Sequence, residues 1–357
     1  MHELEKRNIK HIDIPVVEVE LNIGDEKNRK FTLREFRESD ANQVIQVLKS
    51  EYEKTYIKEY LYDTTSMLEA IKNKIDIIYV AESKNEIVSI VILTRFDSID
   101  ERYEACGFVV KPSYRGTGLM EHMVNYIFDA IRRYNPPAML VYASVYHNII
   151  QREIEKRGMK MVGIKVGNLL MTSFKISFKY SEKCLKYSNY IYVLPLSKKS
   201  VGRVVLHNDI AAFAMEIYNE IDVKAQLVGA DDAPVPGIEN TRMSGHEDER
   251  NLYAEYDVIE CGANLESMIR AWLASHKEKG WALQISLPSD ETGVWAYNVL
   301  YNMGFFFTGL MTLSCDTERF YMSWIEEDVL HMEDYTVTDN SRAIRDRILA
   351  YMMGRKT

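Results

Sequence analysis

The sequence predicts an α/β protein with a mixed sheet (α+β), built as two similar units in tandem. Three observations predict this class. The 357 residues fit two domains of about 150 residues each. The first half alternates short apolar strands with amphipathic helices. The second half repeats the end of that order: strand, short helix, glycine, then a strand with an interior glycine, which is Gly163 in the first copy and Gly309 in the second.

Composition limits the class of protein further. Hydrophobic residues make up 46% and charged residues 27%, which excludes wholesale disorder, and a net charge of −9 argues against a broad nucleic-acid or membrane surface. The four cysteines (Cys106, Cys184, Cys261 and Cys315) lack disulfide or zinc spacing, so no metal is expected. No signal peptide or membrane span is apparent. We therefore expect a cytoplasmic protein with no nucleic acid and no membrane as partners.

In the first half, turn residues and apolar periodicity mark the elements in order. A helix should open at Ser39 or Asp40, because either residue can cap it. The polar pair Lys84-Asn85 between two apolar runs predicts a hairpin. The expected strands are 12–23, a short one near 31–36, 77–83, 86–96, 103–111, 139–146 and 159–167, and the expected helices are 40–50, 65–74, 119–135 and 149–158.

The second half repeats part of this pattern. Its expected strands are 190–197, 252–260, 281–288 and 305–314, and its expected helices are 207–221, 265–279 and 295–304. The acidic stretch 228–250, which carries glycine and proline, is expected to be a long loop. The domain bounds that follow are an N-terminal arm 1–30, a first domain 31–185, a second domain 186–325 and a helical tail 326–357.

The segment from Val109 to Leu119 is the most informative for function. A strand stops at Pro112, the chain turns through Gly116 and Gly118, and a helix begins. Glycine allows a close backbone approach and positive φ, and the N–H groups that open a helix suit a pyrophosphate. A Walker A lysine and the third glycine of a dinucleotide loop are both absent. On residue chemistry alone, a turn that simply needs glycine is an equally good interpretation.

This segment resembles the acetyl-CoA-binding motif of the GNAT acetyltransferase superfamily, (Q/R)-x-x-G-x-(G/A) after a strand ending V-x-P-x-(Y/F). Arg115 and Gly118 match its first and fourth positions, and Met120 stands where Gly or Ala is usual. The approach is matched by Val110, Pro112 and Tyr114. The resemblance in element order covers about residues 31–165. The whole chain also looks like a bacterial subgroup with a second, degenerate GNAT-like half, whose members are often encoded near, or fused to, anti-sigma-type regulators.

The resemblance implies how the co-substrate acetyl-CoA would bind. It would lie between the strands 103–111 and 139–146, with its pantetheine arm along the first strand like an added strand. An acceptor amine would then attack the thioester directly, without a covalent intermediate on the protein. The implied acetyl-CoA-binding residues are Phe108, Val109, Val110, Arg115, Gly116, Thr117, Gly118, Leu119 and Met120.

The resemblance also implies candidates for proton transfer. Glu104 stands where many GNAT enzymes keep a base that acts through water, and a solvated carboxylate at a strand end is the alternative. The tyrosine that usually protonates the leaving thiolate falls at Ile154 here. The expected substitutes near the end of the strand 139–146 are Tyr142, Tyr146 and His147, although a capping or surface role for His147 is the alternative.

Three functions are compatible with these inferences. The first is acetyl-CoA-dependent N-acetyl transfer to a small-molecule or peptide amine. The alternatives are a non-catalytic acyl-CoA sensor that regulates a partner protein and a binding module that has lost CoA altogether. A homodimer or a regulatory protein partner stays open. The second half has no RGxG, and Gly262 beside Glu260 is expected to be a poor pyrophosphate cradle.

Overall fold

The computed structural model describes residues 14–95, 102–172, 185–276, 280–314, 317–326, 330 and 332–354. These residues divide into two compact units: unit 1 runs to Val141, and unit 2 begins at Tyr142. The division falls inside one strand and lies before the boundary expected at 185/186, so the domain bounds stay a prediction. Cys184 and Cys315 lie outside the described residues, whereas Cys106 and Cys261 are free thiols.

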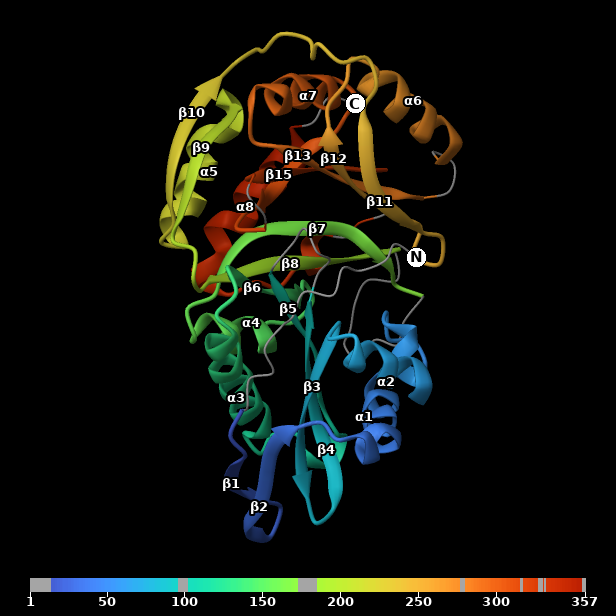
Figure 1. Cartoon of the computed structure of the whole chain (residues 1–357), viewed down its shortest axis with the longest axis vertical. Helices are drawn as coiled ribbons and strands as arrows, with labels where there is room; N and C mark the ends of the chain where they lie inside the picture. Colours follow the sequence, from blue (N-terminus) through green and yellow to red (C-terminus); the bar gives the residue numbers. More distant parts are fainter. Residues whose placement is uncertain are drawn as a thin grey trace. The chain divides into compact units, whose positions relative to one another are not determined.

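Unit 1 is a mixed sheet between two helical layers. Its strands follow the order β1-β2-β3-β4-β5-β6, and only the β5–β6 pair is parallel. In Figure 1, α3 covers one face of this sheet, and α1 and α2 cover the other. The elements are β1 (Val17–Ile23), β2 (Glu26–Glu35), α1 (Ala41–Tyr52), α2 (Thr64–Lys72), β3 (Asp76–Ser83), β4 (Glu86–Arg95), β5 (Tyr103–Val110), α3 (Leu119–Tyr134) and β6 (Ala138–Ser144), with short 3₁₀ turns η1 (Glu38–Asp40), η2 (Glu59–Tyr62) and η3 (Pro112–Tyr114).

Local sequence explains most of unit 1. Lys84 and Asn85 both take positive φ, 52° and 64°, which is the geometry of the tight hairpin expected between β3 and β4. The expected apolar face of α1 is buried against β3, β4 and β5. Asp40 does precede α1, but its side chain makes no cap hydrogen bond. Its carboxylate instead pairs with Arg34, with 2.7 Å between Nη1 and Oδ2, because that guanidinium is buried beside it.

The strands of unit 2 follow the order β8-β7-β14-β15-β13-β12-β11, and β9 and β10 form a separate parallel pair. Its strands are β7 (Lys160–Leu170), β8 (Lys186–Pro195), β9 (Ser200–His207), β10 (Lys224–Ala230), β11 (Arg242–Asp248), β12 (Tyr253–Glu260), β13 (Ala282–Pro288), β14 (Phe306–Met311) and β15 (Arg319–Ile325). Its helices are α4 (Ile149–Glu155), α5 (Asn208–Glu220), α6 (Leu265–His276), α7 (Glu291–Asn302) and α8 (Asp339–Met353), with η5 (Met332–Asp334).

One expectation for unit 2 is wrong. The stretch 228–250 is not a loop throughout, since it contains the end of β10 and all of β11. β11 has an almost wholly exposed, charged sequence, and it becomes a strand because it pairs along its length with β12. Sequence reasoning also missed β9, β10 and β15.

The two repeated glycines lie opposite each other. Gly163 of β7 pairs with Gly309 of β14 in an antiparallel register. A Cβ on Gly163 would lie 2.8 Å from the carbonyl oxygen of Thr308, and one on Gly309 would lie 3.1 Å from the Gly163 nitrogen. Only residues without side chains permit this approach. The two glycines that the sequence analysis singled out therefore have a direct structural reason.

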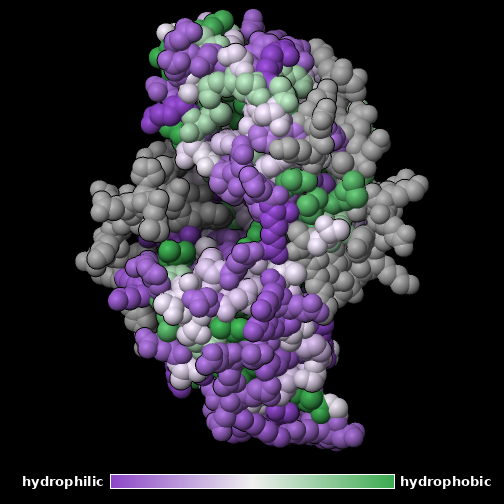
Figure 2. All heavy atoms as spheres, turned by 90° about the vertical axis from the view of Figure 1, so that its right-hand side faces the viewer, coloured by the Kyte–Doolittle hydropathy of each residue, from purple (hydrophilic) through white to green (hydrophobic). Residues whose placement is uncertain are grey.

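The described surface of unit 1 is mostly polar on the face where α1 and α2 lie, in the lower part of Figure 2. Asn42 and Gln46 of α1 are among its exposed residues.

Across the described part of the chain, every helix is too short or too polar to span a membrane. Nor do any three His, Cys, Asp or Glu side chains there gather in a way that could hold a metal ion.

Candidate functional site

The loop between β5 and α3 provides open space at two glycines. Gly116 and Gly118 take φ of 75° and 86°, conformations that side chains rarely adopt. A Cβ added to either would meet no atom within 4 Å. Gly118 is the N-cap of α3 and has no side chain that could cap it. The helix therefore begins on an exposed loop, where N–H groups can meet an anion.

Arg115 and Tyr114 hold this loop against the sheet. Arg115 Nε donates to the Val110 carbonyl oxygen at 3.1 Å, and its guanidinium pairs with Glu51 of α1. Tyr114 is buried, and its hydroxyl accepts from Arg29 at 2.9 Å and donates to Glu86 at 3.1 Å. Thr117 Oγ1 donates to the Tyr114 carbonyl oxygen at 2.8 Å. The expected loop residues from Arg115 to Met120 thus lie together at the end of β5.

β5 contains a bulge that sequence reasoning missed. Between the pairs Ile90↔Val109 and Ile92↔Cys106, β5 uses one more residue than β4. Gly107 lies in this interval with φ of 59°, and a Cβ there would lie 2.9 Å from Ile92 Cδ1. A glycine inside a strand pattern is the usual signal of a bulge. The bulge changes the direction of the strand just before Phe108, Val109 and Val110.

The parallel edge of β5 is open over most of its length within unit 1. β5 pairs with β6 at Tyr103↔Met139 and Glu104↔Leu140, and the described ladder between them has no other pair. An extended ligand could add to such an edge through backbone hydrogen bonds. Glu104 lies at the other end of β5 from the loop, six residues from Val110, which is about 20 Å for an extended strand.

Glu104 does not stand as an isolated carboxylate. Lys58, in the connection between α1 and α2, lies with its Nζ 3.3 Å from Glu104 Oε2 and 3.2 Å from Cys106 Sγ. Both charged side chains are largely buried, with 15% and 16% of their surface exposed. Lys58 also donates to Thr94 Oγ1. Lys58 is a further residue that the sequence analysis did not identify, because no local pattern links it to β5.

Charge and burial set the protonation of this cluster. Burial raises the pKa of Cys106 to about 11, with a contribution from Glu104, so Cys106 is a neutral thiol near pH 7. Burial works against the charged form of Lys58, but Cys106, Glu104 and Asp76 outweigh it and raise the pKa of Lys58 above its ordinary value. The side of β5 that faces α1 and α2 therefore carries a fixed ammonium group beside a carboxyl group.

The other two expected proton-transfer residues belong to unit 2. Tyr146 is buried, and its hydroxyl donates to the Lys186 carbonyl oxygen at 3.4 Å, with Tyr187 and Tyr335 around its ring. His147 is half-buried, and its carbonyl oxygen accepts from Gln151 Nε2 at 2.9 Å. This bond gives Gln151 a structural role, but it uses only the backbone of His147 and not its imidazole. The catalytic roles of Glu104, Tyr146 and His147 stay predictions.

Ile154 is a core residue of α4 with none of its surface exposed. A residue that protonates a leaving thiolate must carry an acidic proton and reach the reacting sulfur. A buried aliphatic side chain such as that of Ile154 does neither. If this chain transfers acetyl groups, it therefore uses another source of that proton.

Comparison with protein families gives one match. A model described as the acetyltransferase (GNAT) family matches residues 41–148, which run from α1 through the loop and α3 to the end of β6 and just beyond. Residues 41–148 thus carry a GNAT acetyltransferase domain, as the motif suggested. No curated protein matches the sequence.

Solved structures similar to this chain include several N-acetyltransferases. An N-acetyltransferase from Staphylococcus aureus is 11% identical, with a TM-score of 0.37, over 46% of this chain and 98% of its own. A ribosomal-protein-S18-alanine N-acetyltransferase from Escherichia coli is also 11% identical, with a TM-score of 0.37, over 47% of this chain and 94% of its own. A Salmonella typhimurium protein described as an acetyltransferase, with its cofactor acetyl-CoA, is 16% identical, with a TM-score of 0.38, over 46% and 94%.

Proposed function

We propose that this protein, whose residues 41–148 carry a GNAT domain, transfers an acetyl group from acetyl-CoA to a primary amine. The observation that carries the proposal is the loop after β5. Two glycines at positive φ lie against open space at the start of a 16-residue helix. A pyrophosphate needs this combination of close backbone approach and N–H donors.

The proposed binding mode uses β5 from end to end. The phosphates lie on the loop from Arg115 to Gly118 and on the first turn of α3, at Leu119 and Met120. The pantetheine arm pairs with Phe108, Val109 and Val110 on the open edge of β5, beyond the bulge at Gly107. The acetyl group then lies toward the Glu104 end. A backbone N–H there polarises the thioester carbonyl, an effect worth about 3–4 kcal/mol in other acyl-transfer sites.

In the proposed reaction the acceptor amine loses a proton and attacks the thioester carbonyl carbon. The new C–N bond forms, the C–S bond breaks, and CoA leaves as a thiolate that takes a proton. Glu104 is the proposed base for the amine proton, through water. Tyr146 and His147 are the proposed sources of the proton for the thiolate.

Two measurements test this function. Isothermal titration with acetyl-CoA tests binding, and thiol titration of released CoA tests turnover with a panel of amines: spermidine, kanamycin and a lysine-containing peptide. Acetyl-CoA at a concentration of about 100 times its Kd should stabilise the fold by about 2.7 kcal/mol. Acetyl-CoA that neither binds nor stabilises the protein would refute the proposal.

A second function is favoured by one observation, the buried Ile154 in place of the usual acid. The chain would then bind acyl-CoA without catalysis and signal to a partner protein. This function predicts tight acetyl-CoA binding with no CoA release above the rate without protein for any amine in the panel.

A further inference from the structure

A cluster of polar side chains surrounds Lys58 inside unit 1. Three members come from the connection between α1 and α2, and the others come from β3, β4 and β5. They are Tyr56, Lys58, Tyr60, Asp76, Thr94, Glu104 and Cys106. None of them belongs to the loop that the acetyl-CoA motif describes. Glu104 is the one member that sequence reasoning had singled out for catalysis.

The hydrogen-bond directions in this cluster follow from donor counts. Thr94 Oγ1 donates its single hydrogen to Asp76 Oδ1 at 2.6 Å. Tyr60 donates to the other oxygen of Asp76, also at 2.6 Å, and Asp76 is 1% exposed. Because Thr94 has no second hydrogen, it must accept the bond from Lys58. Asp76 thus fixes Thr94 in the orientation that receives Lys58.

Lys58 uses all three of its N–H bonds. One donates to Thr94, one to Glu104 Oε2 at 3.3 Å and one to Cys106 Sγ at 3.2 Å. A neutral amine has only two N–H bonds, but its lone pair could accept the hydrogen of the Cys106 thiol, so the donor count alone does not fix the protonation of Lys58. The contact with the Glu104 carboxyl group and the raised pKa of Lys58 make it an ammonium group. An ammonium group has no lone pair, so Lys58 is neither a base nor an acetyl acceptor in this arrangement.

We propose that Lys58 is a positioning residue, whose fixed positive charge orients Glu104 and keeps its carboxylate ionised to receive the proton of the acceptor amine. This inference rests on the proposed acetyl transfer. The titratable groups that surround the pair are Cys106 on β5, Asp76 on β3, and Tyr56 and Tyr60 in the α1–α2 connection. The two oxygens of Asp76 accept hydrogen bonds from Thr94 and Tyr60.

The pH dependence of kcat/KM tests the role. Lys58→Met removes the charge and keeps an unbranched apolar side chain. The acid limb of the profile, measured with the best amine of the panel, should move to higher pH by about one unit or more. The rate should recover at alkaline pH. Lys58→Arg, which keeps a positive charge, should return the limb toward its original position. A uniform loss of rate at all pH values, with no movement of the limb, would show a merely structural role.

A matched control and a double variant make the test specific. Lys84 forms an exposed pair with Glu26 at 2.9 Å, also in unit 1, and Lys84→Met should leave the profile unchanged. In a Glu104→Gln background, Lys58→Met should cause no further movement of the limb, because the proposed action passes through Glu104. The same movement in both backgrounds would overturn the proposal.

A readout without any acceptor separates this inference from the proposed function. Protein labelled with ¹³C at the glutamate side-chain carboxyl carbon is titrated by NMR, and the spectrum of Glu104→Gln identifies the Glu104 signal. The pH midpoint of that signal should rise in Lys58→Met. If no amine is acetylated, the proposed function fails while this midpoint still decides the role of Lys58. An unchanged midpoint overturns the inference. If Lys58→Met does not fold, Lys58→Gln is titrated in its place.

Discussion

Unit 1 and unit 2 each contain a strand that leads through a glycine-bearing loop into a helix and then into a parallel strand. In unit 1 these are β5, α3 and β6, and in unit 2 they are β12, α6 and β13. β5 and β6 pair at two positions, Tyr103↔Met139 and Glu104↔Leu140. β12 and β13 pair at five, from Tyr253↔Ala282 to Asp257↔Ser286. The strand edge that stays open in unit 1 is therefore closed in unit 2.

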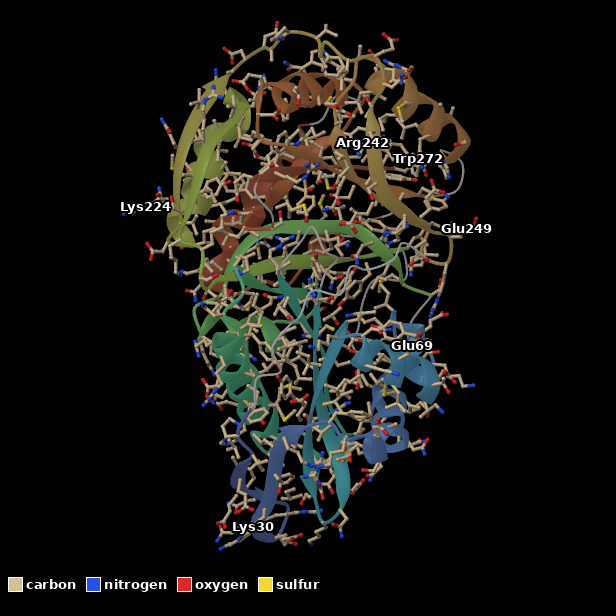
Figure 3. The ribbon with its side chains drawn as sticks, viewed as in Figure 1. Lys30, Glu69, Lys224, Arg242, Glu249 and Trp272 are labelled. Atoms are coloured by element: carbon tan, nitrogen blue, oxygen red, sulfur yellow. The ribbon has the colours of Figure 1, made fainter. Side chains whose placement is uncertain are left out.

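The loops that precede α3 and α6 also differ in free space, which is open in unit 1 and filled in unit 2. Gly118 faces open space, whereas a Cβ on Gly262 would lie 2.5 Å from the Thr241 nitrogen. The chain itself fills the place of a ligand in unit 2, through residues 238–241, which we call the strap. Ala263 N donates to the Ile238 carbonyl oxygen at 2.9 Å, and Gly262 N donates to Thr241 Oγ1 at 3.0 Å. The strap leads directly into Arg242, labelled in Figure 3, where β11 begins.

This comparison teaches what a helix start requires. The first N–H groups of a helix have no partners within the helix, so another group must accept from them. In unit 2 the strap supplies acceptors to the loop that precedes α6. In unit 1 the loop before α3 is exposed, and an anion can supply them. The expectation that Gly262 is a poor pyrophosphate cradle thus agrees with the structure, for a steric reason beyond the nearby glutamate.

The largest expected effect is the loss of acetyl-CoA affinity in the Gly118→Val variant. A side chain there would occupy the space next to the proposed phosphates, so we expect at least about a hundredfold weaker binding by calorimetry. The strain of a valine at φ of 86° should also cost about 1–2 kcal/mol of fold stability. Gly24→Val is the matched control, because Gly24 also has positive φ and open space but lies in the β1–β2 turn. Parent-like acetyl-CoA affinity in Gly118→Val would reduce the loop to a simple turn.

The reverse pattern is expected for Gly262→Val. Its side chain would collide with the backbone of the strap, so the free energy of unfolding in urea should fall by about 1–3 kcal/mol. Acetyl-CoA affinity should not change, since the proposed acetyl-CoA site lies in unit 1. Weakened binding in a folded Gly262→Val variant would contradict the assignment of the two loops to different roles.

The two units also differ in how they hold a buried lysine, and pH can reveal the difference. Lys186 is 1% exposed and donates to the Asn251 and Leu252 carbonyl oxygens, both at 2.7 Å, just before β12. Lys58 lies beside carboxylates, whereas burial lowers the pKa of Lys186 from 10.5 to about 7. Above pH 7 the unfolded chain keeps a proton that the folded chain has released, so stability should rise with pH.

We expect the free energy of unfolding to rise by about 1 kcal/mol between pH 7 and pH 8, and to keep rising toward pH 10.5. The measurement is the unfolding free energy of the parent relative to Lys186→Met at each pH, which cancels the other titrating groups. A difference that does not depend on pH would show that Lys186 keeps an ordinary pKa in the folded state.

The smallest expected effect is that of Arg115→Ala. The change removes a positive charge beside the proposed phosphates, and KM for acetyl-CoA should rise about fivefold, with a smaller fall in kcat. The effect is limited because the guanidinium already pairs with Glu51 and the Val110 carbonyl oxygen. Steady-state kinetics with the best amine checks it, and a fall in kcat without a rise in KM would place Arg115 in the chemical step instead.

Sequence by itself determined the features that depend on neighbouring residues. The hairpin at Lys84-Asn85, the helix that begins at Leu119 and the glycine loop before it all follow from turn preferences and apolar periodicity. These features are local because φ preferences and the period of a helix or strand act over a few residues. The motif carried by the loop was also enough to point to the GNAT family that matches residues 41–148.

Only the tertiary structure decided which distant residues meet. Gly163 pairs with Gly309, which is 146 positions away in the sequence. Gly262 contacts Thr241 of the strap, 21 positions away, and Lys58 lies beside Glu104, 46 positions away. β11 shows the same limit, since its exposed charged sequence becomes a strand only through its pairing with β12. Such contacts depend on the burial and hydrogen bonding of the whole fold, and no local pattern encodes them.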